Sequence, residues 1–102
     1  MTKNNSHMYK YDKRNSSIKI YINGKIVNRN DAKISVFDSG FLLGDGVWEG
    51  IRLHQSTLVY IEDHLNRLYD SAKGISLNIH YSKEDLINEI NKTLSKNNMD
   101  DD

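Results

Sequence analysis

The sequence contains no cysteine and no proline among its 102 residues. The missing cysteine excludes a disulfide framework and a thiolate metal site. No apolar run approaches the roughly 20 residues that a membrane-spanning helix needs. The first sixteen residues are polar and lack the apolar centre of a secretory signal. We therefore expect a soluble protein of the reducing cytoplasm, with no membrane partner.

An excess of one charge is also missing, because lysine plus arginine and aspartate plus glutamate number 14 each. A nucleic-acid binder normally carries a basic surplus, so we expect no nucleic-acid partner. The charges gather at the two ends of the sequence, where apolar side chains are scarce. We interpret residues 1–16 as a disordered polar tail and residues 98–102 as an acidic tail. Residues 17–97 then form one small domain, whose stability margin should be thin.

Hydrophobic alternation predicts two β-hairpins. Residues 18–22 alternate isoleucine with other side chains, and Asn23-Gly24 follows, the dipeptide most typical of a two-residue hairpin turn. These features predict a hairpin over residues 18–27. A second alternation and a β-rich run predict another over residues 48–61, with its turn at Gln55-Ser56.

Two helices are predicted after the hairpins. Residues 62–73 have apolar side chains at three-and-four spacing, with acidic residues at the start and Gly74 as a C-terminal cap. Residues 83–96 repeat this spacing, and Ser82 with Asp85 forms a near capping box. Between the hairpins, residues 38–46 hold three glycines and are predicted to form a shaped loop.

This order of elements predicts an α+β fold, built as an antiparallel sheet of two hairpins with two helices on one side. So few strands leave a sheet edge open to pairing. We therefore expect an incomplete small domain, truncated before its sheet is finished.

The segment from Gly40 to Arg52 is dense in glycine, which is costly in backbone entropy. One interpretation is a tight turn followed by a strand with a bulge at Gly50. The other is a pocket wall, because Trp48, Gly50 and Arg52 would share one strand face. A flat aromatic ring, a gap and a cation side by side suit a small substrate that carries a carboxylate.

Two further interpretations of the same segment are weaker. Gly44-Asp45-Gly46 lacks the lysine and the spacing of a nucleotide phosphate loop. Asp38, Asp45 and Glu49 do not have the spacing of a calcium loop. We expect no metal in this protein.

Arg67 lies one turn after His64 near the start of the first predicted helix. It could be a surface residue that pairs with Asp63 or Asp70 along the helix. It could instead bind an anion, because an arginine fork contacts phosphate oxygens in two places at once.

Five short segments are more informative together than singly. They are Tyr21-Ile22-Asn23-Gly24-Lys25, Asp38-Ser39-Gly40-Phe41, Gly44-Asp45-Gly46-Val47-Trp48-Glu49-Gly50-Ile51-Arg52, His64-Leu65-Asn66-Arg67-Leu68 and Ser71-Ala72. Their order and gaps resemble the N-terminal small domain of class IV aminotransferases. This family includes branched-chain amino acid aminotransferase, D-amino acid aminotransferase and aminodeoxychorismate lyase. The resemblance covers residues 18–94.

The resemblance implies that pyridoxal 5'-phosphate lies between this domain and a larger one, with Arg67 on the cofactor phosphate. It implies a substrate pocket lined by Leu43, Trp48, Gly50 and Arg52. Leu43 stands where many relatives have a tyrosine, which leaves substrate preference open. Gly-Asp-Gly is shared with the D-amino acid and lyase branches, whereas Glu-Gly-Ile-Arg is more like the branched-chain branch, which we favour.

The family's Schiff-base lysine and the carboxylate partner of the pyridine nitrogen lie in the large domain, beyond residue 102. We therefore assign no catalytic residue and expect the 102-residue chain alone to be inactive. The parent protein, expected to be a homodimer, would transfer an amino group between a branched-chain amino acid and 2-oxoglutarate. The alternatives are D-amino acid aminotransferase, aminodeoxychorismate lyase, a non-catalytic binding module of the same shape, or a structural domain with a coincidental resemblance.

Overall fold

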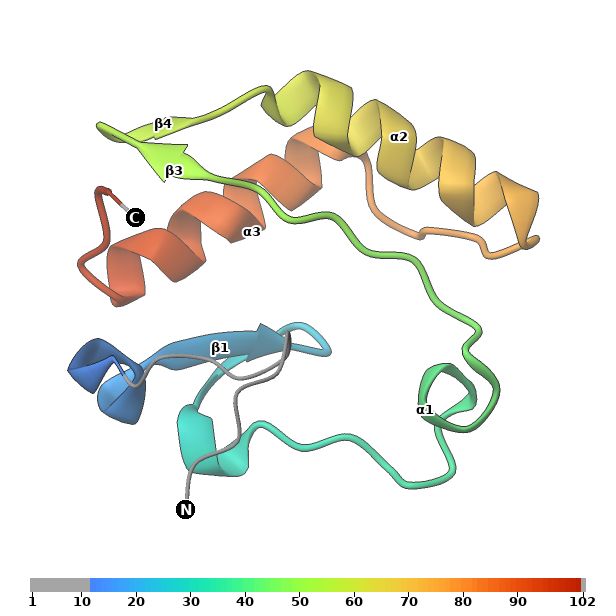
Figure 1. Cartoon of the computed structure of the whole chain (residues 1–102), viewed down its shortest axis with the longest axis horizontal. Coiled ribbons are helices and arrows are strands. Elements are labelled where there is room, and N and C mark those ends of the chain that lie inside the picture. The colour runs from blue at the N-terminus through green and yellow to red at the C-terminus, as the bar shows by residue number, and fades with distance from the viewer. Residues whose placement is uncertain (1–11, 102) are drawn as a thin grey trace, which may run out of the picture.

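A computed structural model describes residues 12–101, in which short strands alternate with helices (Figure 1). The predicted α+β class is confirmed. The two hairpins form separate two-stranded sheets and do not join into one. In chain order the elements are η1 (Lys13–Ser17), β1 (Lys19–Ile22), β2 (Lys25–Asn28), η2 (Arg29–Asp31), α1 (Ser39–Leu43), β3 (Leu53–His54), β4 (Thr57–Leu58), α2 (Ile61–Gly74) and α3 (Lys83–Lys96).

The first hairpin has the turn that the sequence predicts. Strands β1 and β2 pair antiparallel, and Ile22 opposes Lys25 at the closed end. Asn23 and Gly24 have φ values of 50° and 85°. Positive φ at both central residues is what a type I′ turn requires, and asparagine and glycine tolerate it best.

The second hairpin is shorter than the predicted span of residues 48–61. Its turn lies at Gln55-Ser56 as predicted, but β3 and β4 pair over only two residues each. The last bond of the ladder runs from the Val59 amide to the Arg52 carbonyl. Tyr60 then has a φ of 54° and leads into α2. Residues 44–51 are therefore not paired into a sheet, because the chain turns away at Tyr60 and enters α2.

The prediction of a loop over residues 38–46 is wrong, since five of these residues form α1. The Asp38 side chain accepts hydrogen bonds from the amides of Gly40 and Phe41, as a helix N-cap does. Gly44, with a φ of 73°, ends the helix in the left-handed conformation. The sequence contains both cap residues, Asp38 and Gly44, but the high glycine content of the segment favoured the prediction of a loop.

The two long helices agree with the predicted ranges to within one residue at each end. Ser82 caps α3 by accepting a hydrogen bond from the Asp85 amide, as predicted. Gly74 is the last residue of α2 and does not itself have a positive φ. Ser76, two residues later, has the positive φ instead.

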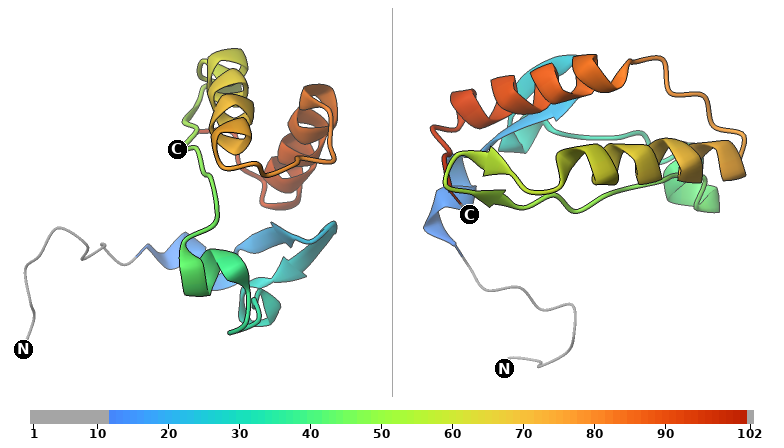
Figure 2. Two further views of the ribbon diagram at one scale, coloured as in Figure 1. Left: turned by 90° about the vertical axis from the view of Figure 1, so that its right-hand side faces the viewer. Right: turned by 90° about the horizontal axis from the view of Figure 1, so that it is seen from above.

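Figure 2 shows α2 and α3 on the same side of the β1–β2 hairpin. The buried apolar side chains among the described residues are few: Leu53, Leu65 and Ala72. Asn97, which follows α3, ties that helix to the edge of β1. Its side chain accepts from the Lys19 amide at 2.7 Å and donates to the Lys19 carbonyl at 3.0 Å. One side-chain amide thus satisfies both backbone groups of an edge-strand residue.

The two ends of the described chain are more ordered than tails extending freely into solvent. Residues 13–16, predicted to be part of the polar tail, belong to η1, and Asp12 caps this 3-10 helix. The rest of the predicted polar tail lies outside the described residues. At the other end the Asp100 carbonyl accepts from the Ser56 amide, and the Asp101 carboxylate accepts from the Gln55 amide. The acidic segment is therefore attached to the β3–β4 turn.

Candidate functional site

The segment before β3 has two faces, although it is not paired into a sheet. Val47, Glu49 and Ile51 are partly buried, and Leu53 is fully buried. The intervening side chains, Trp48, Gly50, Arg52 and His54, are exposed. This is the alternation of an extended chain with one face packed inward. The predicted shared face of Trp48, Gly50 and Arg52 is therefore present, opposite Ile51 and Leu53.

Gly50 leaves space beside the exposed indole of Trp48, which is 83% exposed. A β-carbon added at Gly50 would stand 3.4 Å from Trp48 Cζ3. That separation is at the short limit of ordinary van der Waals contact, so a side chain larger than alanine here would press on the ring. The glycine thus leaves room for the indole on this face.

A carboxylate lies on the inward face of the same segment. Glu49 is only 10% exposed and binds two residues of α2. Its Oε1 is 2.6 Å from His64 Nδ1 and 2.7 Å from Arg67 Nη2, and its Oε2 is 2.9 Å from Arg67 Nε. The contact with Arg67 is a bidentate pair, in which two parallel N–H groups meet both carboxylate oxygens.

The position of a proton on His64 follows from these distances. A ring nitrogen 2.6 Å from a carboxylate oxygen must carry the hydrogen between them. Arg67 Nη2 also lies 3.3 Å from this nitrogen, but both atoms are then donors, so the approach is not a hydrogen bond. His64 is therefore an Nδ1–H donor to Glu49, and its Nε2 is the remaining hydrogen-bonding atom.

These contacts change the acidity of the groups. Hydrogen bonds from Arg67 and then from His64 lower the pKa of Glu49 to about 2. Glu49, and more weakly Asp63, raise the pKa of Arg67. Within residues 12–101, Arg67 pairs with Glu49 and not with Asp63 or Asp70. The partners predicted for it as a surface residue are thus wrong.

Arg67 also borders a hollow of about 330 Å³, whose other lining residues are Tyr60, Asp63 and His64. The Arg67 side chain is 66% exposed. Its Nε and Nη2 atoms are bound by Glu49, and no described residue bonds its Nη1 atom. An arginine has five N–H donors, so the guanidinium retains donors for an anion.

Leu43 stands apart from the Trp48 wall. It is the last residue of α1 and is 74% exposed. Helix α1 and strand β3 lie at opposite ends of the extended segment in Figures 1 and 2. Of the predicted site residues, the structure thus brings Trp48, Gly50 and Arg52 onto one face. Arg67 is bonded to Glu49, which lies on the opposite face of the same segment. The structure does not bring Leu43 to these residues.

Sequence reasoning gave Glu49 no role in the site. A signal for it was present, because the alternation put a carboxylate among Val47, Ile51 and Leu53 on the inward face. A carboxylate that faces inward needs a charged or hydrogen-bonding partner. Which partner it has depends on residues 15 and 18 positions away, which no local pattern specifies.

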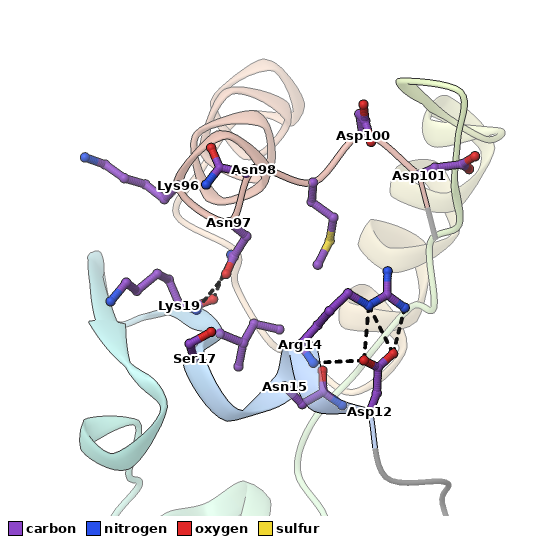
Figure 3. Close-up of a pocket in the computed structure, with 12 residues that line it drawn as sticks. Asp12, Arg14, Asn15, Ser17, Lys19, Lys96, Asn97, Asn98, Asp100 and Asp101 are labelled. Carbon is purple, nitrogen blue, oxygen red and sulfur yellow. Dashed lines mark hydrogen bonds and ion pairs between the residues drawn. The ribbon is translucent and has the colours of Figure 1, made fainter.

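A second hollow, of about 630 Å³, lies between η1, the start of β1 and the segment that follows α3 (Figure 3). Its charged groups are of both signs and are partly paired. Arg14 bonds Asp12 at 2.6 Å and lowers the pKa of that carboxyl to about 2. Asn97 and Lys19 are also already bonded to each other, as Figure 3 shows. The lining therefore presents no uniform charge to a ligand.

Two other classes of site are missing from the part of the chain that the structure describes. Residues 12–101 contain no group of three or more histidine, cysteine, aspartate or glutamate side chains that could hold a metal ion. No helix among them is long and apolar enough to cross a bilayer.

The sequence profile of the family described as Amino-transferase class IV matches residues 46–101, which include the Glu49–His64–Arg67 cluster. The chain belongs to the class IV aminotransferases. It is 49% identical over 84 residues to a protein of Methanocaldococcus jannaschii assigned as a branched-chain-amino-acid aminotransferase. It is 40% identical over 81 residues to a D-alanine aminotransferase of Staphylococcus epidermidis. These alignments cover 82% and 79% of this chain, but each covers 29% of the relative.

Solved structures agree with this family. The branched-chain aminotransferase of Thermoproteus uzoniensis, crystallised with norvaline, matches with a TM-score of 0.76 and 31% identity. The match covers 83% of this chain and 30% of that one. A second branched-chain amino acid aminotransferase, from the organism abbreviated T.th., is complexed with N-(5'-phosphopyridoxyl)-L-glutamate. It matches with a TM-score of 0.75 and 28% identity, over 82% and 30% of the two chains. The sequence therefore spans less than a third of the length of these proteins.

Proposed function

We propose that this chain is the part of a pyridoxal 5'-phosphate-dependent aminotransferase that binds the cofactor phosphate and forms one wall of the substrate pocket. The observation that carries the proposal is the state of Arg67. Its guanidinium is held on one edge by Glu49 and exposed on the other, beside a hollow. Family membership supplies the ligand, because one solved relative is complexed with a phosphopyridoxyl compound.

The residues around the hollow fit a phosphate group. Arg67 offers the Nη1 donors, and His64 lines the same hollow. The hollow also lies at the first turns of α2, where the helix dipole favours anions. Asp63 is the one acidic side chain in the lining and opposes the anion. The donors and the dipole together outweigh this single, exposed carboxylate.

Pyridoxal phosphate, when bound, supplies the electron sink that lets an amino group move between an amino acid and a 2-oxo acid. The chain's own residues position the reactants. Arg67 binds the phosphate and so orients the ring. On the exposed face of the segment before β3, Arg52 binds a substrate carboxylate, and the Trp48 ring excludes water from the substrate's apolar side chain.

For the substrate we propose a branched-chain amino acid, with 2-oxoglutarate as the amino acceptor. The identity of 49% to the M. jannaschii protein and the Glu-Gly-Ile-Arg motif support this choice. A D-amino acid is the second candidate, because a D-alanine aminotransferase of Listeria innocua is 42% identical to this chain over 82 residues, and the resemblance through Gly-Asp-Gly points to the same branch. Leu43, at the end of α1, would join the pocket only if α1 approaches the Trp48 wall in the assembled protein.

Exposed apolar side chains on residues 34–48 support a large partner domain. Phe37 and Leu43 are 83% and 74% exposed. Apolar groups gathered in this way usually mark an interface. We propose that residues 17–97 are the small domain, and that a large domain of the same protein and a second subunit cover this segment. The remaining members of the exposed set are Ile34, Val36, Phe41, Leu42 and Trp48.

The phosphate role of Arg67 is tested by Arg67→Lys in the full-length protein. A lysine keeps the charge but cannot bind Glu49 and a phosphate at once with a planar fork. A charge-assisted hydrogen bond contributes about 1.5–3 kcal/mol, so we expect roughly ten- to a hundredfold weaker cofactor binding. The measurement is a titration of the apoenzyme with pyridoxal 5'-phosphate, followed by absorbance.

Arg29→Lys is the matched control, because Arg29 bonds the Asn15 carbonyl at the other side of the molecule. This variant should leave the dissociation constant unchanged. Equal dissociation constants for wild type and Arg67→Lys would show that Arg67 is only a surface charge, and the non-catalytic module would then be favoured.

A further inference from the structure

Glu49 has the shortest side-chain contacts of the site, yet the proposed function assigns it no task. Its carboxylate is 10% exposed, and both oxygens are bonded to α2. Within residues 12–101 it is also the side chain that links the exposed wall of Trp48 to the helix that carries Arg67. Its position between these two parts suggests a role in arranging them.

The contact with Arg67 determines which donors remain for a ligand. Glu49 occupies the edge of the guanidinium formed by Nε and Nη2. The plane of the group is thereby fixed, and the Nη1 donors remain on the opposite side. Without this carboxylate, an arginine that is 66% exposed would sample many rotamers.

The contact with His64 fixes a second group in the same way. One oxygen of Glu49 accepts from the His64 ring and from Arg67 Nη2 at 2.6 and 2.7 Å. The histidine is held as the Nδ1–H donor, and its orientation is set by an atom that also holds the arginine. A single carboxylate therefore holds both Arg67 and His64, two of the side chains that line the hollow.

Glu49 has two opposite effects on an anion in this hollow. Its negative charge repels the anion, and its hydrogen bonds order the donors. Across the width of a guanidinium, with the anion on the solvent-exposed side of Arg67 at physiological salt, the repulsion is worth about threefold in affinity. Ordering a flexible arginine in advance is worth up to roughly thirtyfold. The ordering effect is the larger of the two.

We propose that Glu49 is a positioning residue, which strengthens phosphate binding at Arg67 despite its negative charge. This inference rests on the proposed function, because the phosphate in question is that of pyridoxal 5'-phosphate. The inference differs from the proposed function because it assigns the affinity for the cofactor phosphate to the pair of Glu49 and Arg67, and not to Arg67 alone.

The test compares the affinity of the full-length apoenzyme for pyridoxal 5'-phosphate in four forms: wild type, Glu49→Gln, Glu49→Asp and Asp63→Asn. The glutamine keeps the length of the side chain and loses its charge, whereas the aspartate keeps the charge and loses the reach. Asp63→Asn is the matched control, because Asp63 lines the same hollow and influences Arg67 through its charge alone. We expect about tenfold weaker binding for Glu49→Gln, in which the lost ordering exceeds the lost repulsion. For Glu49→Asp, which keeps the repulsive charge, we expect up to roughly thirtyfold weaker binding. Asp63→Asn should bind the cofactor as tightly as wild type or up to about threefold more tightly.

A second readout separates positioning from general stability. In wild type, the Arg67 Nε–H proton should give a sharp NMR signal protected from exchange, and this signal should be lost in Glu49→Gln while the variant still unfolds in a single cooperative transition. If Glu49→Gln proves poorly folded, Glu49→Asp carries the comparison. Tighter cofactor binding in Glu49→Gln, matching Asp63→Asn, would overturn the inference and leave Glu49 as a charge only.

The same titrations separate this inference from the proposed function. If Arg67→Lys weakens binding and neither Glu49 variant does, the phosphate site stands and the positioning role of Glu49 is refuted. If Arg67→Lys has no effect, both fail together.

Discussion

Two regions of this molecule differ in how well they use their apolar side chains. The hairpin of β1 and β2, together with α2 and α3, forms a packed region that contains Leu65 and Ala72, each 2% exposed. Residues 34–52 form the other region, where Phe37 and Trp48 are both 83% exposed. One region uses apolar groups to hold its own fold, whereas the other presents them outward.

The difference separates residues that stabilise this fold from residues for which a binding role is proposed. A folded chain gains roughly 25 cal/mol for each Å² of apolar surface that it buries. Residues 34–52 forgo much of that gain, so packing within this chain does not explain their composition. The proposed binding of residues 34–52 to a substrate and to a large domain would explain it better.

The largest effect should come from truncating the core of the packed region. Leu65→Ala removes a side chain that is 2% exposed. Such changes lower the free energy of unfolding by about 2–5 kcal/mol, a large share of a small domain's stability. The matched control is Leu43→Ala, the same substitution at a side chain that is 74% exposed. We expect a change within about 0.5 kcal/mol there. If urea denaturation gave a similar fall in the free energy of unfolding for both variants, the contrast between the two regions would be refuted.

A smaller loss is expected where α3 is tied to β1. Asn97→Ala removes the bonds to both backbone groups of Lys19 and one to the Thr93 carbonyl. Partly buried groups then lose their partners, so the free energy of unfolding should fall by about 1–3 kcal/mol. Asn91→Ala, at an exposed position of the same helix, should change it by less than about 0.5 kcal/mol. An unchanged urea midpoint in Asn97→Ala would show that the tie contributes nothing.

The smallest effect concerns the carboxylate that joins the two regions. The pKa of Glu49 falls from 4.5 to about 2 on folding, because it binds Arg67 and His64. A carboxyl with a lower pKa in the folded state stabilises the fold above its unfolded pKa, and this stabilisation is lost as the pH falls through the folded pKa. The melting temperature should therefore drop between about pH 4.5 and pH 2.

Glu49→Gln isolates this contribution from that of Asp12, whose pKa is lowered in the same direction. The difference in melting temperature between wild type and Glu49→Gln should shrink as the pH falls across that range. A difference that stays constant with pH would show that the ion pair does not form in solution.

The elements predicted best from the sequence were those specified by nearby residues. Asn23-Gly24 identified the first turn, and Ser82 identified the start of α3, because each acts on backbone groups within a few positions. Helix α1 was missed because several glycines follow its Asp38 cap, and glycine usually disfavours helix. The second hairpin was predicted too long because the left-handed conformation of Tyr60 turns the chain away after Val59, so residues 48–51 have no partner strand.

In the candidate site, too, the features set by nearby residues were predicted and the contacts between distant residues were not. The exposed face of Trp48, Gly50 and Arg52 followed from the alternation alone. The partner of Arg67 did not, because Glu49 lies 18 positions away and three-dimensional packing brings the two together. Arg67 could be identified from the family resemblance, whereas its fixed orientation became visible only in the structure.

The central claim is that Arg67, held by Glu49, binds the phosphate of pyridoxal 5'-phosphate. A crystal structure of the full-length protein with this cofactor tests the claim most directly. We predict a phosphate oxygen within about 3.2 Å of Arg67 Nη1, with the Glu49 carboxylate still on the Nε edge. A cofactor phosphate bound elsewhere, with Arg67 contacting only Glu49 and solvent, would contradict the account.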